Sequence, residues 1–373
     1  MKLISIEPTP NPNSMKLNLD ESLSKGVSRT YTTADRAACP DPIGKLLDVP
    51  GVKSLFHLAD FIAVERHARS DWQGILAGVR RAFGEVPEPA VVAAAGTMAE
   101  PPATFGEVRV EVQMFRDIPM LVKVSAGTET LRQALPERFT GAVHRAAARS
   151  PNMLMERRWV HQGARYGELQ QIAQEVAEDL TAAYDEPRVE QLVRRALLDG
   201  EPVSEPRTHA MHVPQLPEHS DWRVRYAVLE RISPRPDAIP VFAKALRDPQ
   251  STIRRLAAVY LGLTGDPAAV PPLCDALADA TVAVRRTAGD ALSDLADRRA
   301  IGPMTKALED QSKLVRWRAA RFLYETGDES ALPALKARQD DSEFEVRMQV
   351  RLAIERIEGG HSGPGSIWRQ MTS

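Results

Sequence analysis

The sequence predicts an α+β N-terminal half followed by an α-solenoid, a stack of short helical units. Three observations support this prediction. Arginines recur at a 31-residue step in the C-terminal part, apolar and polar residues alternate in several short segments of the first half, and proline-rich segments separate regions of different composition. A fixed period indicates a solenoid, because one short unit cannot bury its own apolar face and must stack on copies of itself.

The composition limits the classes of protein and partner. The chain has 373 residues, enough for two or three domains, and its net charge of −2 favours neither a nucleic-acid nor a membrane partner. Cys39 and Cys274 suggest no disulfide framework, so we expect a cytoplasmic protein. An acid and prolines come too early for a signal peptide, and no apolar run approaches the ~18–20 residues that a membrane span needs.

Residues 1–84 are predicted to form a small α/β domain. Met15, Leu17 and Leu19 alternate with polar residues, as expected of a half-buried strand. The other expected elements are a strand over residues 3–6, a short helix over residues 42–47, a hairpin of residues 52–58 and 61–65, and a helix capped by Ser70 or Asp71.

A loop rich in proline and asparagine follows the first strand. The loop and later segments of the domain resemble the N-terminal domain of Nfu-type iron–sulfur scaffold proteins, and the residues that carry the resemblance are 7–16, 50–53, 60–64 and 71–72. Nfu proteins hold their cluster with a Cys-x-x-Cys in a separate domain, and this chain contains no such pair. Because thiolate ligation of a cluster needs several cysteines close together, the resemblance implies recognition of a partner without a bound cluster, and no cofactor is expected.

The same loop has two interpretations. It forms either a rigid surface for a protein partner or a turn whose prolines and asparagines fix unusual backbone angles. For the first interpretation the candidate contact residues are Pro10, Asn11, Asn13 and Lys16.

Residues 85–104 form a linker of proline, alanine and valine, and residues 105–200 are predicted to form a middle α/β domain. Val108, Val110 and Val112 alternate with polar residues and indicate a strand. The other expected elements are a strand over residues 120–124, a helix over about 130–148, a strand over 157–160, and helices over 166–184 and from 187 to about 198.

Two further segments have the composition of linkers. Residues 201–220 contain four prolines and the pair His209 and His212, but no carboxylate or cysteine at a suitable spacing, so we predict no metal site there. Residues 359–373 form a tail rich in glycine and serine. Trp368 in this tail is either part of a docking peptide or part of a frayed end.

The 31-residue period lies within residues 221–358. An aspartate precedes each repeated arginine by six residues, and the pairs are Asp248 and Arg254, Asp279 and Arg285, Asp310 and Arg316, and Asp341 and Arg347. Each unit is predicted to contain a first helix with the arginine, a turn with an aspartate that caps, and a second helix with a proline in its first turn. The pattern resembles the short HEAT-like repeats of bilin-lyase-type proteins.

The repeated aspartates and arginines have two interpretations. In the first, they form an intramolecular ladder in which each aspartate pairs with an arginine of its own or the next repeat. In the second, arginines bind a partner or a nucleic acid. Residues 218–358 contain 22 basic and 22 acidic residues, and nucleic-acid binders usually have a basic surface, so we favour the ladder. The candidate partner-binding residues off the ladder are Arg255, Arg286, Arg318, Arg351, Trp222 and Trp317.

The order of parts resembles the conserved virulence factor C family of bacteria over nearly the whole chain. The segments that carry this resemblance are residues 60–66 and 79–85, together with the repeats. The family name implies a regulatory influence on virulence-factor production.

The chain contains no Gly-x-Gly-x-x-Gly, Gly-x-Ser-x-Gly or His-Glu-x-x-His motif, and no catalytic or metal-binding residues are predicted. The leading hypothesis is therefore a non-enzymatic cytoplasmic adaptor for protein partners, regulatory or linked to iron–sulfur protein maturation. The alternatives are an RNA- or DNA-associated regulator that uses arginines of the repeats, and an enzyme of the lyase or glycosylase kind on a HEAT-like scaffold.

Overall fold

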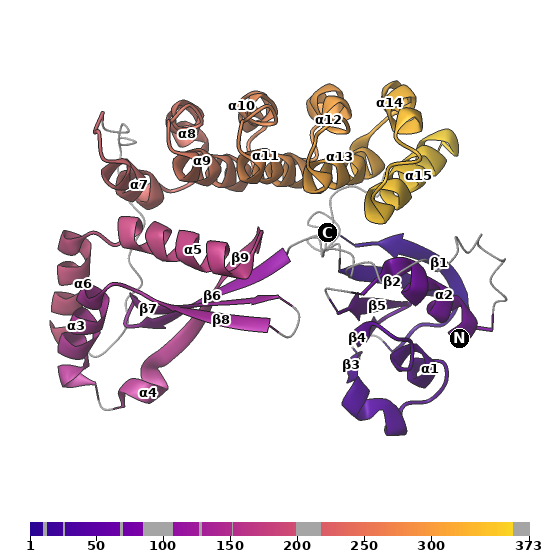
Figure 1. Cartoon of the computed structure of the whole chain (residues 1–373), viewed down its shortest axis with the longest axis horizontal. Helices are drawn as coiled ribbons and strands as arrows, with labels where there is room; N and C mark the ends of the chain where they lie inside the picture. Colours follow the sequence, from indigo (N-terminus) through magenta and orange to yellow (C-terminus); the bar gives the residue numbers. More distant parts are fainter. Residues whose placement is uncertain are drawn as a thin grey trace, which may run out of the picture. The chain divides into compact units, whose positions relative to one another are not determined.

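The computed structural model describes residues 1–9, 13–24, 27–67, 70–84, 107–126, 129–150, 152–198 and 218–360 (Figure 1). Its contacts divide the chain into two units, Met1–Glu107 and Val108–Ser373. The predicted α+β N-terminal half and α-solenoid are both confirmed. Within the described ranges, every helix is too short or too polar to cross a membrane. The predicted linkers and tail lie wholly or mainly outside the described residues, as do His209, His212 and Trp368.

The first unit contains an antiparallel sheet with the strand order β1-β2-β5-β4-β3. The strands are β1 (Leu3–Pro8), β2 (Ser14–Leu19), β3 (Ser28–Thr32), β4 (Val52–Leu58) and β5 (Phe61–Arg66), and the helices are α1 (Ile43–Leu47) and α2 (Trp72–Ala82). Met15, Leu17 and Leu19 are buried, as their alternation predicts. Asp71 caps α2 by accepting a hydrogen bond from the Gly74 amide at 2.8 Å.

Strand β3 and the 3-10 helix that follows it at Thr33–Ala38 were not predicted from the sequence. The strand is at the edge of the sheet and most of its side chains are exposed. An exposed edge strand shows no alternation of apolar and polar residues, so its sequence carries little signal.

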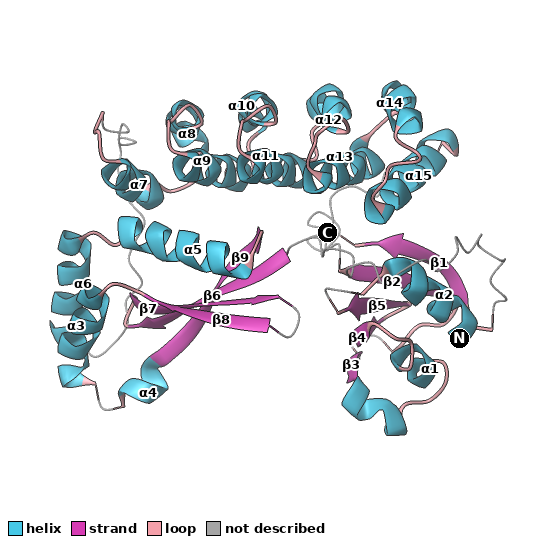
Figure 2. Cartoon of the chain, viewed as in Figure 1, coloured by secondary structure: helices cyan, strands magenta, loops and turns pink. Residues whose placement is uncertain are grey.

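The middle region of the second unit contains a sheet with the order β8-β7-β6-β9, covered by helices (Figure 2). The strands are β6 (Glu107–Phe115), β7 (Ile118–Ala126), β8 (Glu129–Ala134) and β9 (Arg157–Tyr166), and the helices are α3 (Glu137–Ala146), α4 (Met153–Glu156), α5 (Leu169–Ala183) and α6 (Glu186–Leu198). Val108, Val110 and Val112 are fully buried in the core between the sheet and these helices.

The helix predicted over about residues 130–148 is present, but its predicted start was wrong. Residues 129–134 form strand β8, which pairs antiparallel with β7, and α3 begins only after Pro136. β8 is an edge strand whose side chains are largely exposed, so tertiary pairing rather than its own pattern decides its conformation. Pro136 fixes the start of the helix because a proline without an N–H is tolerated there.

The solenoid consists of two rows of helices (Figures 1 and 2). The row of first helices contains α7 (Trp222–Arg231), α9 (Ser251–Leu263), α11 (Val282–Leu295), α13 (Lys313–Thr326) and α15 (Phe344–Glu358). The row of second helices contains α8 (Ile239–Ala245), α10 (Val270–Ala276), α12 (Ile301–Ala307) and α14 (Leu332–Ala337), each preceded by a 3-10 turn. The predicted caps are present: Asp266, Asp297 and Asp328 each accept a hydrogen bond from a main-chain amide two residues ahead.

Successive first helices approach each other closely. A Cβ atom added to Gly262 in α9 would lie 2.7 Å from the Cβ of Ala291 in α11 and 3.2 Å from its Cα. The glycine is therefore needed for the distance between the two helices rather than for backbone conformation. Gly141 in α3, by contrast, has no atom within 4 Å of its added Cβ apart from its chain neighbours and its own helix.

The same substitution, glycine to alanine, at positions 262 and 141 tests this packing, with Gly141→Ala as the control. We expect Gly262→Ala to lower the free energy of unfolding, because overpacking costs about 1–3 kcal/mol and the gain in helix propensity offsets at most about 1 kcal/mol of it. Gly141→Ala should raise stability by about 0.5–1 kcal/mol, since only the propensity gain remains in the middle of α3. Urea unfolding measures both, and equal effects would contradict the close approach.

Candidate functional site

The aspartates and arginines of the repeats form pairs between successive units. Four arginines each donate two hydrogen bonds, from Nε and Nη2, to the two carboxylate oxygens of one aspartate, at 2.6 to 3.0 Å. The pairs are Arg225 with Asp248, Arg254 with Asp279, Arg285 with Asp310, and Arg316 with Asp341. We call this series the aspartate–arginine ladder. Such bidentate pairs combine charge with fixed geometry and are stronger than neutral hydrogen bonds.

The direction of pairing differs from the prediction, in which each aspartate pairs with an arginine of its own or the next repeat. The carboxylate of each ladder aspartate binds the arginine of the preceding unit, whereas the arginine of its own unit binds only its main-chain carbonyl. For example, Arg285 donates from Nη1 to the carbonyl of Asp279 at 2.8 Å and from Nε to the carboxylate of Asp310 at 2.6 Å. Each arginine therefore joins two successive loops. Arg225 also belongs to the ladder, but it was not predicted because it lies fewer than 31 residues before Arg254.

Each ladder aspartate is also held by its own loop. Its Oδ1 accepts a hydrogen bond from the main-chain amide two residues ahead, at 2.7 Å for Asp279 and Thr281 and at 2.7 Å for Asp310 and Ser312. The carboxylates of Asp248, Asp279 and Asp341 are 2–10% exposed. Burial alone raises their pKa, but the hydrogen bonds from arginine and from the main-chain amide outweigh it and hold the pKa below its usual value.

Arg255, a candidate for binding a partner, binds the middle region of this chain instead. Its Nη2 lies 3.1 Å from Oδ2 of Asp179 in α5, and Arg165 of β9 reaches the same oxygen at 2.5 Å. The Asp179 side chain is 8% exposed. Asp179 thus lies between two arginines, one from the solenoid and one from the sheet.

Two more ion pairs join the middle region to α7. Arg188 of α6 binds Glu230 at 2.8 Å, and Arg231 binds Asp185, between α5 and α6, also at 2.8 Å. Helix α5 also packs against α7 (Figure 1). The row of first helices therefore binds α5 of the same chain, through α7 and through Arg255 of α9.

Arg286, Arg318 and Trp317 form a buried group rather than an exposed face. Arg286 is 3% exposed, pairs with Asp290, and lies over the Tyr166 ring with 4.5 Å between Cζ and the ring centroid. Arg318 lies 2.6 Å from Asp290 and 5.2 Å from the Trp317 ring centroid. Trp317 is 2% exposed, so its predicted role as an anchor on a binding face was wrong, and the indole stabilises the packing of the helices.

The other candidates of the solenoid lie at its two ends. Trp222, at the start of α7, is half-buried and packs edge-on against Tyr226 with 6.0 Å between the ring centroids. Arg351 in α15 is 60% exposed and donates to Asp340 at 2.8 Å. These two side chains are accessible, and a role in binding a partner stays a prediction for both.

In the first unit, Asn13 is buried rather than presented to a partner. It is 9% exposed, its side-chain oxygen accepts a hydrogen bond from Arg66 at 3.2 Å, and its carbonyl accepts one from the Arg66 amide at 3.0 Å. Lys16 is half-buried, with its Nζ 5.0 Å from the centroid of the Phe61 ring. Pro10 and Asn11 lie outside the described residues. The contacts with Arg66 therefore favour a structural role for Asn13 over contact with a partner.

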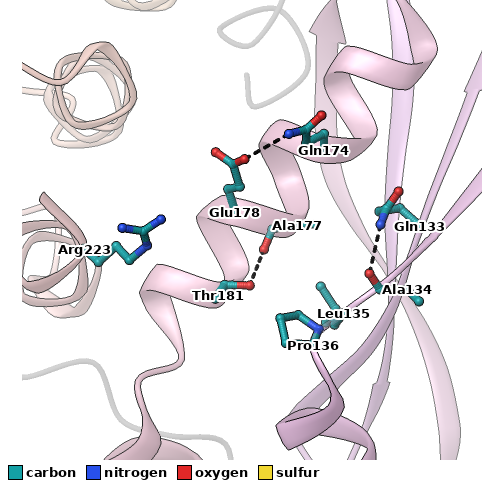
Figure 3. Close-up of a pocket in the computed structure, with 9 residues that line it drawn as sticks. All are labelled: Gln133, Ala134, Leu135, Pro136, Gln174, Ala177, Glu178, Thr181 and Arg223. Carbon is teal, nitrogen blue, oxygen red and sulfur yellow. Dashed lines mark hydrogen bonds between the residues drawn. The ribbon is translucent and has the colours of Figure 1, made fainter.

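An open hollow of about 380 Å³ lies between α5, the segment that joins β8 to α3, and α7 (Figure 3). Its lining includes Leu135, Pro136, Ala177, Glu178 and Arg223. The Thr181 hydroxyl on its wall donates to the Ala177 carbonyl at 2.6 Å, so it is already engaged. No histidine, cysteine or serine lines this hollow, and its groups do not form an acid–base or nucleophilic arrangement.

In the described ranges, no group of three His, Cys, Asp or Glu side chains could hold a metal ion. Both cysteines are half-buried and free of disulfides. Burial raises the pKa of the Cys274 thiol to about 11, which keeps it protonated and a poor nucleophile.

Comparison with known proteins follows the same division of the chain. Residues 4–88 match the family described as "Scaffold protein Nfu/NifU N terminal", residues 113–193 match "Virulence factor", and residues 210–293 and 276–355 match "HEAT repeats". "Conserved virulence factor C" of Staphylococcus aureus (strain MRSA252) is 43% identical over 378 residues, covering 100% of this chain and 99% of the relative. The chain belongs to the conserved virulence factor C family.

A second relative of this chain is the "Uncharacterized protein YpgR" of Bacillus subtilis (strain 168). It is 53% identical over 374 residues, with 100% of this chain and 98% of the relative covered. Among solved structures, protein SAV1430 from Staphylococcus aureus is 44% identical, covering 22% of this chain and 99% of its own, with a TM-score of 0.21. The TM-score is below 0.5, so this likeness adds nothing on the fold or function of the whole chain.

Removing a ladder arginine should destabilise the solenoid. We expect Arg285→Ala to lower the free energy of unfolding by about 2–4 kcal/mol, because it leaves the carboxylate of Asp310 and two loop carbonyls without their donor. The control is Arg223→Ala, which removes an exposed arginine paired at 3.6 Å and should cost less than about 0.5 kcal/mol. Urea unfolding monitored by circular dichroism measures both, and equal losses would contradict a structural ladder.

The depressed pKa values predict how stability depends on pH. A carboxyl whose pKa is lower in the folded chain stabilises it above the unfolded value of about 3.9, and this stabilisation is lost as the pH falls through the folded value. Asp279→Asn should therefore be less stable than wild type at neutral pH, and the gap should narrow below about pH 4. Unfolding free energies measured from about pH 3 to 7 test this, and a gap that stays constant would contradict the ion pair.

Proposed function

We propose that the chain is a non-enzymatic cytoplasmic adaptor that binds protein segments along its solenoid. One observation carries the proposal. The row of first helices holds α5 by placing Arg255 against Asp179, at the contact with α7. The solenoid thus binds one acidic helix of its own chain, and helices of a partner would bind the part of the row that α5 does not cover, since solenoids expose such extended surfaces.

Protein partners fit the charge distribution better than nucleic acid does. The ladder arginines Arg225, Arg254, Arg285 and Arg316 use their donors on carboxylates and loop carbonyls. Arg255 shares Asp179 with Arg165, and Arg286 and Arg318 share Asp290, so these arginines also lie next to carboxylates rather than on an open basic face. Nucleic-acid binding needs several arginines or lysines that can neutralise phosphates.

Two family names add a context to this proposal. The virulence-factor family name suggests that the adaptor influences the production of virulence factors, and the match to the Nfu/NifU N-terminal family suggests that the first unit recognises iron–sulfur proteins. The chain contains only two cysteines, so it cannot supply the four thiolates that usually hold a cluster. We therefore propose recognition without cluster binding.

Affinity purification of the full chain from its native host tests the adaptor function. Quantitative mass spectrometry should find a reproducible set of proteins that remain bound after nuclease treatment. A set that is lost with nuclease, together with RNA retention that weakens with salt in a filter-binding assay, would support the nucleic-acid alternative. No enrichment over a tag-only control would contradict the proposal.

The contact with α5 is tested by Asp179→Asn. We expect faster amide exchange in α5 and α7, by a factor that corresponds to about 2–4 kcal/mol, because Arg165 and Arg255 lose a buried partner. The control is Glu178→Gln, since Glu178 is exposed and its neutralisation should change exchange by less than about 0.5 kcal/mol. Hydrogen exchange with mass spectrometry measures both, and equal protection in the two variants would contradict the docking role of Asp179.

A further inference from the structure

The last arginine of the ladder, Arg347, is positioned like the others. Its Nη1 donates to the carbonyls of Asp341 at 2.5 Å and Ser342 at 3.4 Å. Arg316 makes the same two contacts one unit earlier, with the carbonyls of Asp310 and Gln311, both at 3.0 Å. The Nη1 atom of Arg347 is thus held by the same kind of loop as Nη1 of Arg316.

The Nε and Nη2 atoms of Arg347 have different surroundings from those of every earlier ladder arginine. In Arg225, Arg254, Arg285 and Arg316, Nε and Nη2 bind an aspartate of the following unit. Among the described residues, none offers a carboxylate to these two nitrogens of Arg347. The repeat would place this aspartate 31 residues after Asp341, where the sequence has Thr372. Within the part of the chain that the structure describes, the ladder therefore ends in a fork of two donors that lacks the carboxylate found in each earlier repeat.

A further helical repeat cannot supply this carboxylate by close stacking. Ala258, Gly289 and Ala320 occupy one repeated position, and Gly289 lies at the contact with the next first helix, since its added Cβ would be 2.9 Å from Cγ of Arg318. In α15 the same position holds Arg351, a long side chain that is 60% exposed. Arg351 therefore blocks the approach of another helix at the distance seen within the stack.

A second copy of the chain does not fit either. Stacking head to tail would need an aspartate six residues before the first ladder arginine, Arg225, as in every later unit. The residue at that position is His219. The first unit of another copy thus lacks the group that Arg347 would bind.

We propose that Arg347 is a receptor for the carboxylate of an aspartate in a protein partner, at a turn that begins a helix. This inference rests on the proposed adaptor function and names the chemistry of one partner contact. The ligand class follows from the ladder itself, where each bound aspartate lies in such a turn, as Asp279 does before α11. Binding of an aspartate on a single turn does not require a helix to pack at the position of Arg351, whereas stacking of a further helix pair does.

Arginine modification with phenylglyoxal on the intact chain tests this proposal, with mass spectrometry to map the sites. Arg347 should react faster than Arg254, Arg285 and Arg316, whose forks are occupied. A peptide that copies residues 279–284, at millimolar concentration, should slow the reaction of Arg347 several-fold. The same peptide with asparagine in place of its aspartate is the control and should give no protection, because it lacks the charge for a bidentate ion pair.

Two results would overturn the proposal. The first is an Arg347 that reacts as slowly as the other ladder arginines, which would mean that its fork is occupied. The second is a lack of protection by the aspartate peptide, or equal protection by both peptides. Protection of exposed Arg223 to the same extent as Arg347 would equally show a non-specific effect of charge and overturn it.

Two variants, Arg347→Lys and Arg351→Gln, separate this inference from the proposed function. Arg347→Lys keeps the charge but loses the fork, and it should weaken binding of a purified partner about tenfold, whereas Arg351→Gln should not. If the chain binds its partners equally well with Arg347→Lys, this inference fails and the adaptor function stands. If the chain binds no partner, the adaptor function fails, and the modification experiment still decides whether Arg347 is a carboxylate receptor.

Discussion

The bidentate pair between an arginine of one unit and an aspartate of the next is the interaction on which the solenoid depends. It holds two successive loops together, because the same guanidinium also binds the carbonyl of its own aspartate. Apolar packing alone tolerates sliding between helices, whereas a planar fork and a carboxylate fix the position of each unit on its neighbour. The regular spacing of the first helices follows from this constraint and from the small residues between them.

The ladder also determines which arginines remain for other contacts. With the ladder neutralised, the positions next to it in the sequence, such as Arg255 and Arg286, lie on the row of first helices and meet the middle region of the chain. There they find Asp179 and Tyr166, from α5 and the end of β9. Arginines that a repeat carries in addition to its ladder pair thus bind the middle region of the chain. The net charge of the chain stays near zero.

The sequence predicts the solenoid well because a period is a relation between residues and does not require knowledge of their contacts. The aspartate caps and the proline starts of the second helices follow from local chemistry, and they are also found. The direction of the aspartate–arginine pairs could not be predicted, because the period places an arginine both 6 and 25 residues from each aspartate and does not say which one reaches the carboxylate. The same holds for Trp317, since an indole at a helical position is compatible with a buried contact and with an exposed one.

Errors in the first half of the chain have a different cause. Strands β3 and β8 lie at sheet edges and expose most of their side chains, so pairing with β4 and β7 decides their conformation. Asn13 was interpreted from its presence in a loop, but its contacts with Arg66 come from a residue 53 positions away. Distant partners of this kind leave no pattern in the local sequence.

A double-mutant cycle between Arg285 and its two aspartates measures directly which carboxylate the arginine binds. We expect a coupling energy of about 1–3 kcal/mol between Arg285→Gln and Asp310→Asn, and less than about 0.5 kcal/mol between Arg285→Gln and Asp279→Asn. The reason is that Arg285 binds the carboxylate of Asp310 but only the main-chain carbonyl of Asp279. Equal coupling to both aspartates, or stronger coupling to Asp279, would contradict pairing between successive units.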